Sequence, residues 1–199
     1  YQPAGLANVI TVAASTSTDG KAYFSNHGSK IDVSAPGMDI LSLRAAGTTM
    51  GIPVGTGYTR ADGTSMASPH VAGLAALVLA QHPTWSNEEV RQALRVSASD
   101  AGAAGFDLYN GYGRINASAA VSVTSVLESK IQTPADGAYI AAPTPITGLA
   151  RGPGFDRYVV EYGSGELPST WTPFQQSTTP ASGGTLGTLD PSGLTDAVY

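Results

Sequence analysis

Cysteine is absent from the chain. Its absence excludes a disulfide-stapled scaffold, a thiol nucleophile and a metal site with thiolate ligands. Charged residues are also scarce, at 13% of the 199 residues, and the net charge is -5. Because so few cations cannot form a basic stripe, we expect no nucleic-acid partner.

Long hydrophobic runs are missing as well. The longest, Val71 to Ala80, has about half of the roughly 20 residues that a membrane-spanning helix needs, so we expect no membrane span. The chain starts at Tyr1 without the basic, apolar and small-residue succession of a signal peptide, and we expect processing or truncation to have produced this end. Low charge with abundant Gly, Ala, Ser and Thr indicates a compact extracellular protein.

The composition changes near residue 130, which predicts two domains. Residues 1–127 mix strand and helix patterns and are predicted to be α/β. Residues 131–199 show no convincing helix, and strand candidates separated by Gly, Pro and Ser clusters predict an all-β sandwich. The strand candidates of this second region are Tyr158–Tyr162, Thr170–Thr172 and Thr185–Leu189.

In the first region, an apolar run at residues 8–14 predicts a buried strand. Residues 66–82 form the clearest helix, and because small and apolar residues cover most of its faces, we expect it to be buried on nearly all sides. A capping box predicts the start of a second helix at Ser86, and Asn116 is predicted to cap a third. Further strands are predicted at residues 22–25, 31–33 and 40–43, and the glycine-rich residues 47–63 are predicted to be loop.

The passage Gly63-Thr-Ser-Met-Ala-Ser-Pro-His-Val-Ala-Gly73 carries the chemistry. It places Ser65 in the first turn of a helix, where unpaired N–H groups and the positive end of the helix dipole favour a developing oxyanion. Gly63 allows substrate or backbone to come close to the serine. A serine before an apolar helix is most often only an N-cap, so its position does not settle its role.

The whole string, however, resembles the nucleophile motif of the subtilisin family, Gly-Thr-Ser-Met-Ala-x-Pro-His-Val-Ala-Gly. Similar stretches flank it, among them Asp32-Val-Ser-Ala-Pro-Gly37 and Gly111-Tyr-Gly-Arg-Ile-Asn116. The resemblance runs from Tyr1 to about Val123 and corresponds to the C-terminal part of a subtilisin-like parallel-sheet catalytic domain. The remainder resembles a truncated β-sandwich of the immunoglobulin or fibronectin kind, as found after some bacterial subtilases.

This resemblance implies a serine endopeptidase, secreted and bacterial, that cleaves polypeptides through an acyl-enzyme. It makes Ser65 the nucleophile, with its own backbone N–H as one oxyanion donor. Asp62, Gly63 and Met66 are implied to bind substrate beside it. No metal ligands are read from the sequence, and calcium is implied only by the family.

The family's other catalytic motifs, Asp-Ser/Thr-Gly and His-Gly-Thr, do not occur in these 199 residues. His27 stands on the wrong side of the family's Asp, His, Ser order, His70 is expected to make a core hydrogen bond, and His82 suits the C-terminal end of a helix. We expect Asp32 to order a loop rather than to bind metal. The chain alone is therefore predicted to be inactive, with the missing N-terminal part of the catalytic domain as its partner.

Two other functions compete with this interpretation. A non-catalytic pseudoprotease scaffold that presents a β-sandwich binding module is the alternative. An α/β-hydrolase esterase is disfavoured, because its Gly-x-Ser-x-Gly elbow needs glycine where Ala67 stands and a strand directly before the serine.

Overall fold

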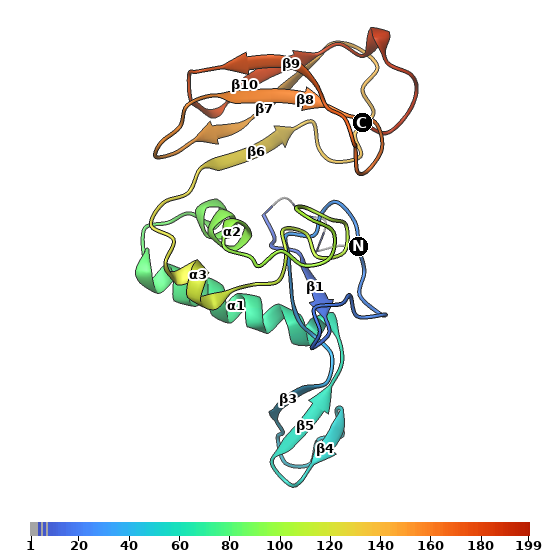
Figure 1. Ribbon diagram of the computed structural model, residues 1–199, viewed down its shortest axis with the longest axis vertical. Helices are drawn as coiled ribbons and strands as arrows, with labels where there is room; N and C mark the ends of the chain where they lie inside the picture. The colour runs from blue at the N-terminus through green and yellow to red at the C-terminus, as the bar shows by residue number, and fades with distance from the viewer. Residues whose placement is uncertain (1–3, 5, 7) are drawn as a thin grey trace. The chain divides into compact units, whose positions relative to one another are not determined.

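The computed structural model describes residue 4, residue 6 and residues 8–199 of the chain. Its backbone contacts divide the chain into two compact units, Tyr1–Val123 and Thr124–Tyr199 (Figure 1). The domain limits of 1–127 and 131–199 stay a prediction.

The first unit is built on two short parallel strands. β1 (Val12–Ser15) and β2 (Val33–Pro36) pair with Val12 opposite Val33. Both strands are almost fully buried, as their small and β-branched residues predict. The long helix α1 (Thr64–Gln81) packs on both strands, and α2 (Asn87–Val96) and α3 (Ala117–Val121) pack on α1. This parallel pair with covering helices confirms the α/β class at the coarse level.

A second, antiparallel sheet leads into α1. Its strands are β3 (Ile40–Leu43), β4 (Ile52–Val54) and β5 (Tyr58–Ala61), in the order β3-β5-β4. The loop predicted for residues 47–63 is therefore wrong, because the short runs 52–54 and 58–61 each find a partner strand. The strand predicted at 22–25 is also wrong: these residues form turns, although Ala22 N–H still donates to Ala14 O at 2.9 Å.

α1 is buried along one stripe only. Ala67, Val71, Leu74 and Val78 recur at helical spacing and face the core, whereas Leu77 is 55% exposed. The expectation of burial on nearly all sides is wrong for this chain. Within the described residues, two short strands and two short helices offer too little apolar surface to cover the other faces.

The predicted caps of the shorter helices are confirmed. Ser86 N–H donates to Glu89 Oε2 at 2.7 Å while Ser86 Oγ accepts from Glu89 N–H at 3.1 Å, which completes the capping box of α2. Asn116 Oδ1 accepts from Ala119 N–H at 3.0 Å at the start of α3.

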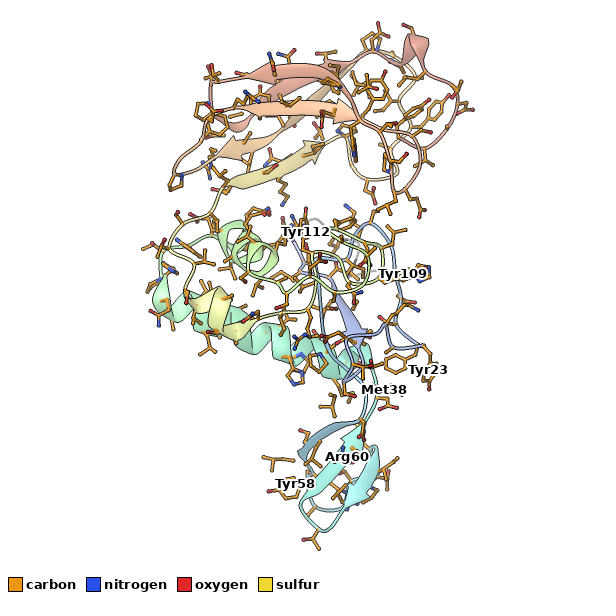
Figure 2. All side chains as sticks on the ribbon, in the orientation of Figure 1. Tyr23, Met38, Tyr58, Arg60, Tyr109 and Tyr112 are labelled. Carbon is orange, nitrogen blue, oxygen red and sulfur yellow. The ribbon has the colours of Figure 1, made fainter. Side chains whose placement is uncertain are left out.

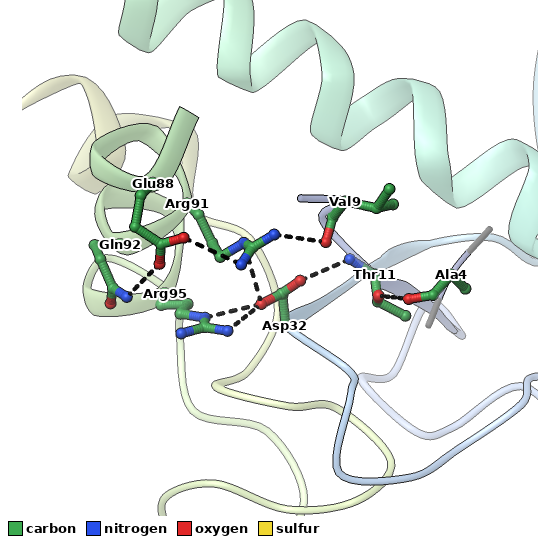
Figure 3. A network of polar contacts seen from close by, with 8 residues as sticks. All are labelled: Ala4, Val9, Thr11, Asp32, Glu88, Arg91, Gln92 and Arg95. Carbon is green, nitrogen blue, oxygen red and sulfur yellow. Dashed lines mark hydrogen bonds and ion pairs between the residues drawn. The ribbon is translucent and has the colours of Figure 1, made fainter. Parts of the chain in front are cut away.

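A buried polar network fastens α2 to the strands (Figure 3). Asp32 is 3% exposed, accepts a 2.7 Å hydrogen bond from Thr11 N–H, and receives Arg95 through both Nε, at 2.9 Å, and Nη2. Arg91 Nη1 forms an ion pair with Glu88 Oε2 at 3.2 Å, and Arg91 Nε lies 3.9 Å from Asp32 Oδ1, the oxygen that Arg95 also contacts. Asp32 is thus a structural anchor, which agrees with the ordering role expected from the sequence.

The second unit is all-β in its described residues apart from one 3-10 turn, Pro191–Gly193. β6 (Glu128–Thr133), β7 (Thr144–Arg151) and β10 (Ala181–Leu189) form one antiparallel sheet, and β8 (Tyr158–Tyr162) and β9 (Thr172–Ser177) form another. One small core draws on both sheets and contains Ile146, Ala150, Val160 and Leu186. An immunoglobulin- or fibronectin-like topology stays a prediction.

No helix in the described part of the chain is both long enough and apolar enough to cross a bilayer.

Candidate active site

Ser65 lies in the first turn of α1, four residues after the end of β5. Its side chain is exposed and borders a cavity of about 340 Å³. Among the described residues, its hydroxyl has no hydrogen-bonding partner. The cavity is lined by β3, by parts of β5 and of the β3–β4 connection, and by the first two turns of α1, with these residues: Ile40, Leu41, Ser42, Leu43, Met50, Thr59, Ala61, Ser65, Met66, Pro69 and His70.

The N-terminal end of α1 has no side-chain cap. Gly63 occupies the N-cap position, and no acidic residue stands in the first turn. The backbone N–H groups of Met66 and Ala67 turn back to Gly63 O at 2.9 and 3.3 Å. Within the described residues, Ser65 N–H has no acceptor, so a donor and the positive end of the dipole stay available beside the hydroxyl.

Two glycines allow the turn before Ser65 to lie against the parallel strands. Gly63 has φ of 155°, and its N–H donates to Gly37 O at 2.8 Å. A Cβ atom on Gly37 would come within 2.6 Å of Ala14 Cβ and 2.9 Å of Gly63 O. Since such contacts are too short for carbon, the close approach requires glycine at position 37.

Asp62 and Met66 flank the serine, as the sequence predicts, but Asp62 is already engaged. Its Oδ1 accepts a 2.6 Å hydrogen bond from Asp39 N–H, and Arg60 in turn pairs with Asp39 Oδ2 at 2.7 Å. Met66 is half-buried and lines the cavity with Ser65. Direct substrate contact by Asp62, Gly63 and Met66 stays a prediction.

In the part of the chain that the structure describes, none of the three histidines forms a hydrogen bond with the Ser65 hydroxyl. His70 Nδ1 bonds to Met66 O at 2.8 Å, but its side chain is exposed at the cavity, so the expected core environment is wrong while the hydrogen bond is present. His82 bonds to Val123 O at 2.8 Å and stacks on Trp85 at 3.8 Å. His27 is exposed and its ring lies beside Tyr109.

Acidic and histidine side chains do not gather into a metal cage of three or more in residues 8–199 or at the two earlier described positions. Such a cluster is the usual sign of a site built from side chains alone.

Sequence reasoning predicted β3 at residues 40–43, which the structure confirms, but missed β4 and β5 and therefore the sheet β3-β5-β4. Its strands carry exposed apolar side chains, of which Leu43 and Ile52 are 79% and 72% exposed. The runs of β-branched and aromatic residues at 52–54 and 58–61 are a strand signal, but the surrounding glycines outweighed it. Tyr58 and Arg60 of β5 can be followed in Figure 2.

Ser65 is exposed at the uncapped N-terminus of a helix that packs on two parallel strands. This setting makes it a candidate nucleophile of the serine-hydrolase type in an α/β chain. The family model described as the subtilase family matches residues 1–113. The chain belongs to the subtilase family.

Individual relatives agree with this assignment. The chain is 44% identical over 118 residues to a subtilisin of Bacillus pumilus, covering 59% of this chain and 38% of that protein. It is 40% identical over 168 residues to an extracellular protease of Xanthomonas campestris pv. campestris, covering 83% of this chain and 28% of the relative. The chain thus spans less than two fifths of the length of these two relatives.

Solved structures of subtilisin-like proteases are also similar, at lower sequence identity. Fervidolysin from Fervidobacterium pennivorans, a keratinolytic enzyme related to subtilisin, matches 82% of this chain with 22% of its own, at a TM-score of 0.55 and 27% identity. A lanthipeptide protease matches 60% of this chain with 44% of its own, at a TM-score of 0.56 and 29% identity.

The family assignment also settles the comparison with α/β-hydrolases. Contrary to the sequence prediction, a strand, β5, does lie just before the serine. It is the central strand of an antiparallel sheet rather than part of the parallel pair, and Ala67 stands where the hydrolase elbow needs glycine.

Proposed function

We propose that this chain is the nucleophile-bearing part of a secreted serine endopeptidase that cleaves polypeptides through an acyl-enzyme on Ser65. The observation that carries the proposal is the open setting of Ser65. Its hydroxyl borders a 340 Å³ cavity at an uncapped helix N-terminus. A tetrahedral intermediate formed there would place its oxyanion beside the Ser65 N–H, and the cavity leaves room for the groups of the substrate.

A serine hydroxyl needs a base to accept its proton and a group to orient that base. Neither meets Ser65 Oγ among the described residues. We therefore propose that the N-terminal part of the catalytic domain supplies the imidazole, the orienting carboxylate and a side-chain oxyanion donor. Alone, residues 1–199 are expected to be inactive.

The exposed faces of α1 support this partner. Leu77 and Leu79 are 55% and 40% exposed on a helix that carries no charged side chain. A second cavity, of about 430 Å³, opens between α1, the start of α2 and the segment leading into β1, and Val12 and Val71 lie in its wall. Such apolar surface on a subtilase chain fits coverage by the rest of the same domain.

The alternative is a pseudoprotease scaffold in which the second unit binds a surface or polymer. The intact Gly63-Thr-Ser-Met66 string and the open hydroxyl favour the protease, because a scaffold has no need of either. The relative described as an extracellular protease supports a location outside the cell. We expect no nucleic-acid partner, since the net charge is -5.

Fluorophosphonate labelling of the full-length product tests the proposal. Wild type is expected to label covalently and Ser65→Ala to be inert. Ser68→Ala is the matched control, because Ser68 is also exposed and stands three residues further along α1. A folded full-length protein that fails to label would favour the scaffold, and labelling that survives Ser65→Ala would place the nucleophile elsewhere.

A further inference from the structure

One face of the sheet β3-β5-β4 is built almost entirely from apolar side chains. Residues that pair across neighbouring strands point to the same face, and so does every second residue along a strand. Tyr58 of β5 pairs with Leu43 and Val54, and two residues further along β5, Arg60 pairs with two more apolar residues. The apolar face of the sheet therefore consists of these six side chains: Leu41, Leu43, Ile52, Val54, Tyr58 and Arg60.

The apolar face lies open to solvent. Its five apolar side chains are each between 39% and 79% exposed. The opposite face of the same sheet differs, because Thr59 is 4% exposed there and its hydroxyl donates to Met50 O at 2.8 Å. Large apolar side chains that are exposed next to one another on three strands are typical of a binding surface.

Arg60 is the one charged member of the apolar face, and its charge is paired. Its Nη1 donates to Asp39 Oδ2 at 2.7 Å and to Asp39 O at 3.1 Å. The methylene groups of an arginine bound in this way still contribute apolar surface. Because no unpaired charge remains on the face, a charged group that docked there would lose water without gaining a partner. The face therefore favours apolar groups. Tyr58 and Arg60 are labelled on this sheet in Figure 2.

The apolar face continues into the cavity that holds Ser65. Leu41 and Leu43 belong to the face and also line the cavity, whereas Tyr58 and the apolar residues of β4 are not part of its wall. In the described part of the chain, the strands of this sheet have few close contacts with α1, β1 or β2, and Figure 1 shows the sheet extending beyond the N-terminal end of α1. A polypeptide held at Ser65 that leaves the cavity past β3 would therefore meet the apolar face next.

We propose that the apolar face binds a stretch of the substrate that is remote from the cleaved bond, and that it selects polypeptides with apolar residues in that stretch. The inference rests on the proposed function, since it needs Ser65 to act on a polypeptide. Continuity with the Ser65 cavity favours the substrate as occupant over a second copy of the chain or the N-terminal part of the domain. The experiment below separates these three occupants.

Kinetics of the full-length product on matched peptides test the proposal. One short peptide carries only the residues around the cleaved bond. Longer versions add an extension of alternating Leu and Tyr, or of alternating Ser and Asn, at either end, and mass spectrometry checks that the same bond is cut. At the end that reaches the sheet, the apolar extension is expected to give a kcat/KM at least about tenfold above that of the polar extension, because it buries apolar surface on both partners.

A variant of the apolar face identifies the surface responsible. Ile52→Thr, Val54→Thr and Tyr58→Thr are combined, because threonine keeps a high strand propensity and removes much of the apolar surface. This variant is expected to bring the ratio of the two kcat/KM values close to one, and Ile52→Thr alone should lower the ratio in part. Val159→Thr is the matched control, since Val159 lies on strand β8 of the second unit and is 42% exposed, and it should leave the ratio unchanged.

The outcomes distinguish this inference from the proposed function. Failure of the folded wild type to cleave any of the peptides would overturn the proposed function and, with it, this inference. Cleavage of the short peptide without a preference for the apolar extension would overturn the inference alone. A preference that survives the triple variant would place the binding surface elsewhere.

Two further measurements identify the other occupants. A dimer of the full-length product that the triple variant converts to a monomer, as seen by analytical ultracentrifugation, would assign the apolar face to a second copy. A fall in the melting temperature of the full-length product that the 199-residue chain does not share would assign it to the N-terminal part of the domain. Either result would overturn the proposal.

Discussion

Asp62 Oδ1 accepts a 2.6 Å hydrogen bond from the backbone N–H of Asp39, across 23 residues of sequence. Asp39 has φ of 58°, a left-handed conformation that is uncommon outside glycine. The bond ties the turn between β2 and β3 to the residues that precede Ser65. Asp62 therefore helps to position the nucleophile turn, in addition to the substrate contact predicted from the sequence.

The first prediction concerns this bond. Asp62→Ala is expected to lower the free energy of unfolding by about 1 kcal/mol, since one exposed charge-assisted hydrogen bond is lost. Asp62→Asn keeps an acceptor oxygen and should recover most of the loss. Urea unfolding followed by the fluorescence of Trp85, with Trp171 replaced by phenylalanine in every variant, measures both. Equal stability of the alanine and asparagine variants would contradict the positioning role.

The second prediction concerns the two glycines at opposite ends of the nucleophile motif. Gly63→Ala is expected to cost about 1–3 kcal/mol, because φ of 155° belongs to a region that other residues rarely adopt. Its Cβ would also meet Met66 Sδ at 3.3 Å.

Gly73→Ala is the matched control for Gly63→Ala. Among the described residues, an added Cβ there meets no atom within 4 Å beyond the neighbouring backbone of its own helix, and alanine should stabilise the helix by about 0.5–1 kcal/mol. Thermal unfolding by circular dichroism separates the two expectations. A neutral Gly63→Ala would show that the turn tolerates a side chain.

The third prediction concerns the buried charge of Asp32. Asp32→Asn is expected to destabilise the first unit by about 3 kcal/mol, because it leaves the partly buried Arg95 guanidinium without its counter-charge. Asp32→Asn combined with Arg95→Gln should cost less than the sum of the two single changes. Additive losses in this double-mutant cycle would mean that the pair is not coupled.

The fourth prediction tests what covers α1. Leu77 is 55% exposed, so Leu77→Lys is expected to change the stability of the 199-residue chain by no more than about 0.5 kcal/mol. If the N-terminal part of the domain packs on this face, the same change should abolish activity recovered by mixing the two parts. Gln81→Lys, at the exposed end of α1, is the control.

Full recovery of activity with Leu77→Lys would show that the partner does not cover this face of α1. The free energy of unfolding of the 199-residue chain would then still show whether position 77 accepts a lysine without loss of stability.

Local signals in the sequence predicted much of the first unit. The capping box at Ser86, the cap at Asn116 and the position of the long helix follow from neighbouring residues, and the structure confirms them. The family follows from the eleven-residue string around Ser65, and the match to residues 1–113 confirms it. The helix caps, the helix position and the motif can be predicted from the sequence, because each involves residues that are close to one another along the chain.

The sequence by itself thus determined the family, the α/β class of the first unit, the all-β character of the second and the helix that carries Ser65. Only the tertiary structure decided that β3, β4 and β5 form a sheet beside this serine and that α1 is covered on a single stripe. The physical reason is that strand pairing, burial and the meeting of side chains depend on segments distant in sequence, which local propensity cannot rank.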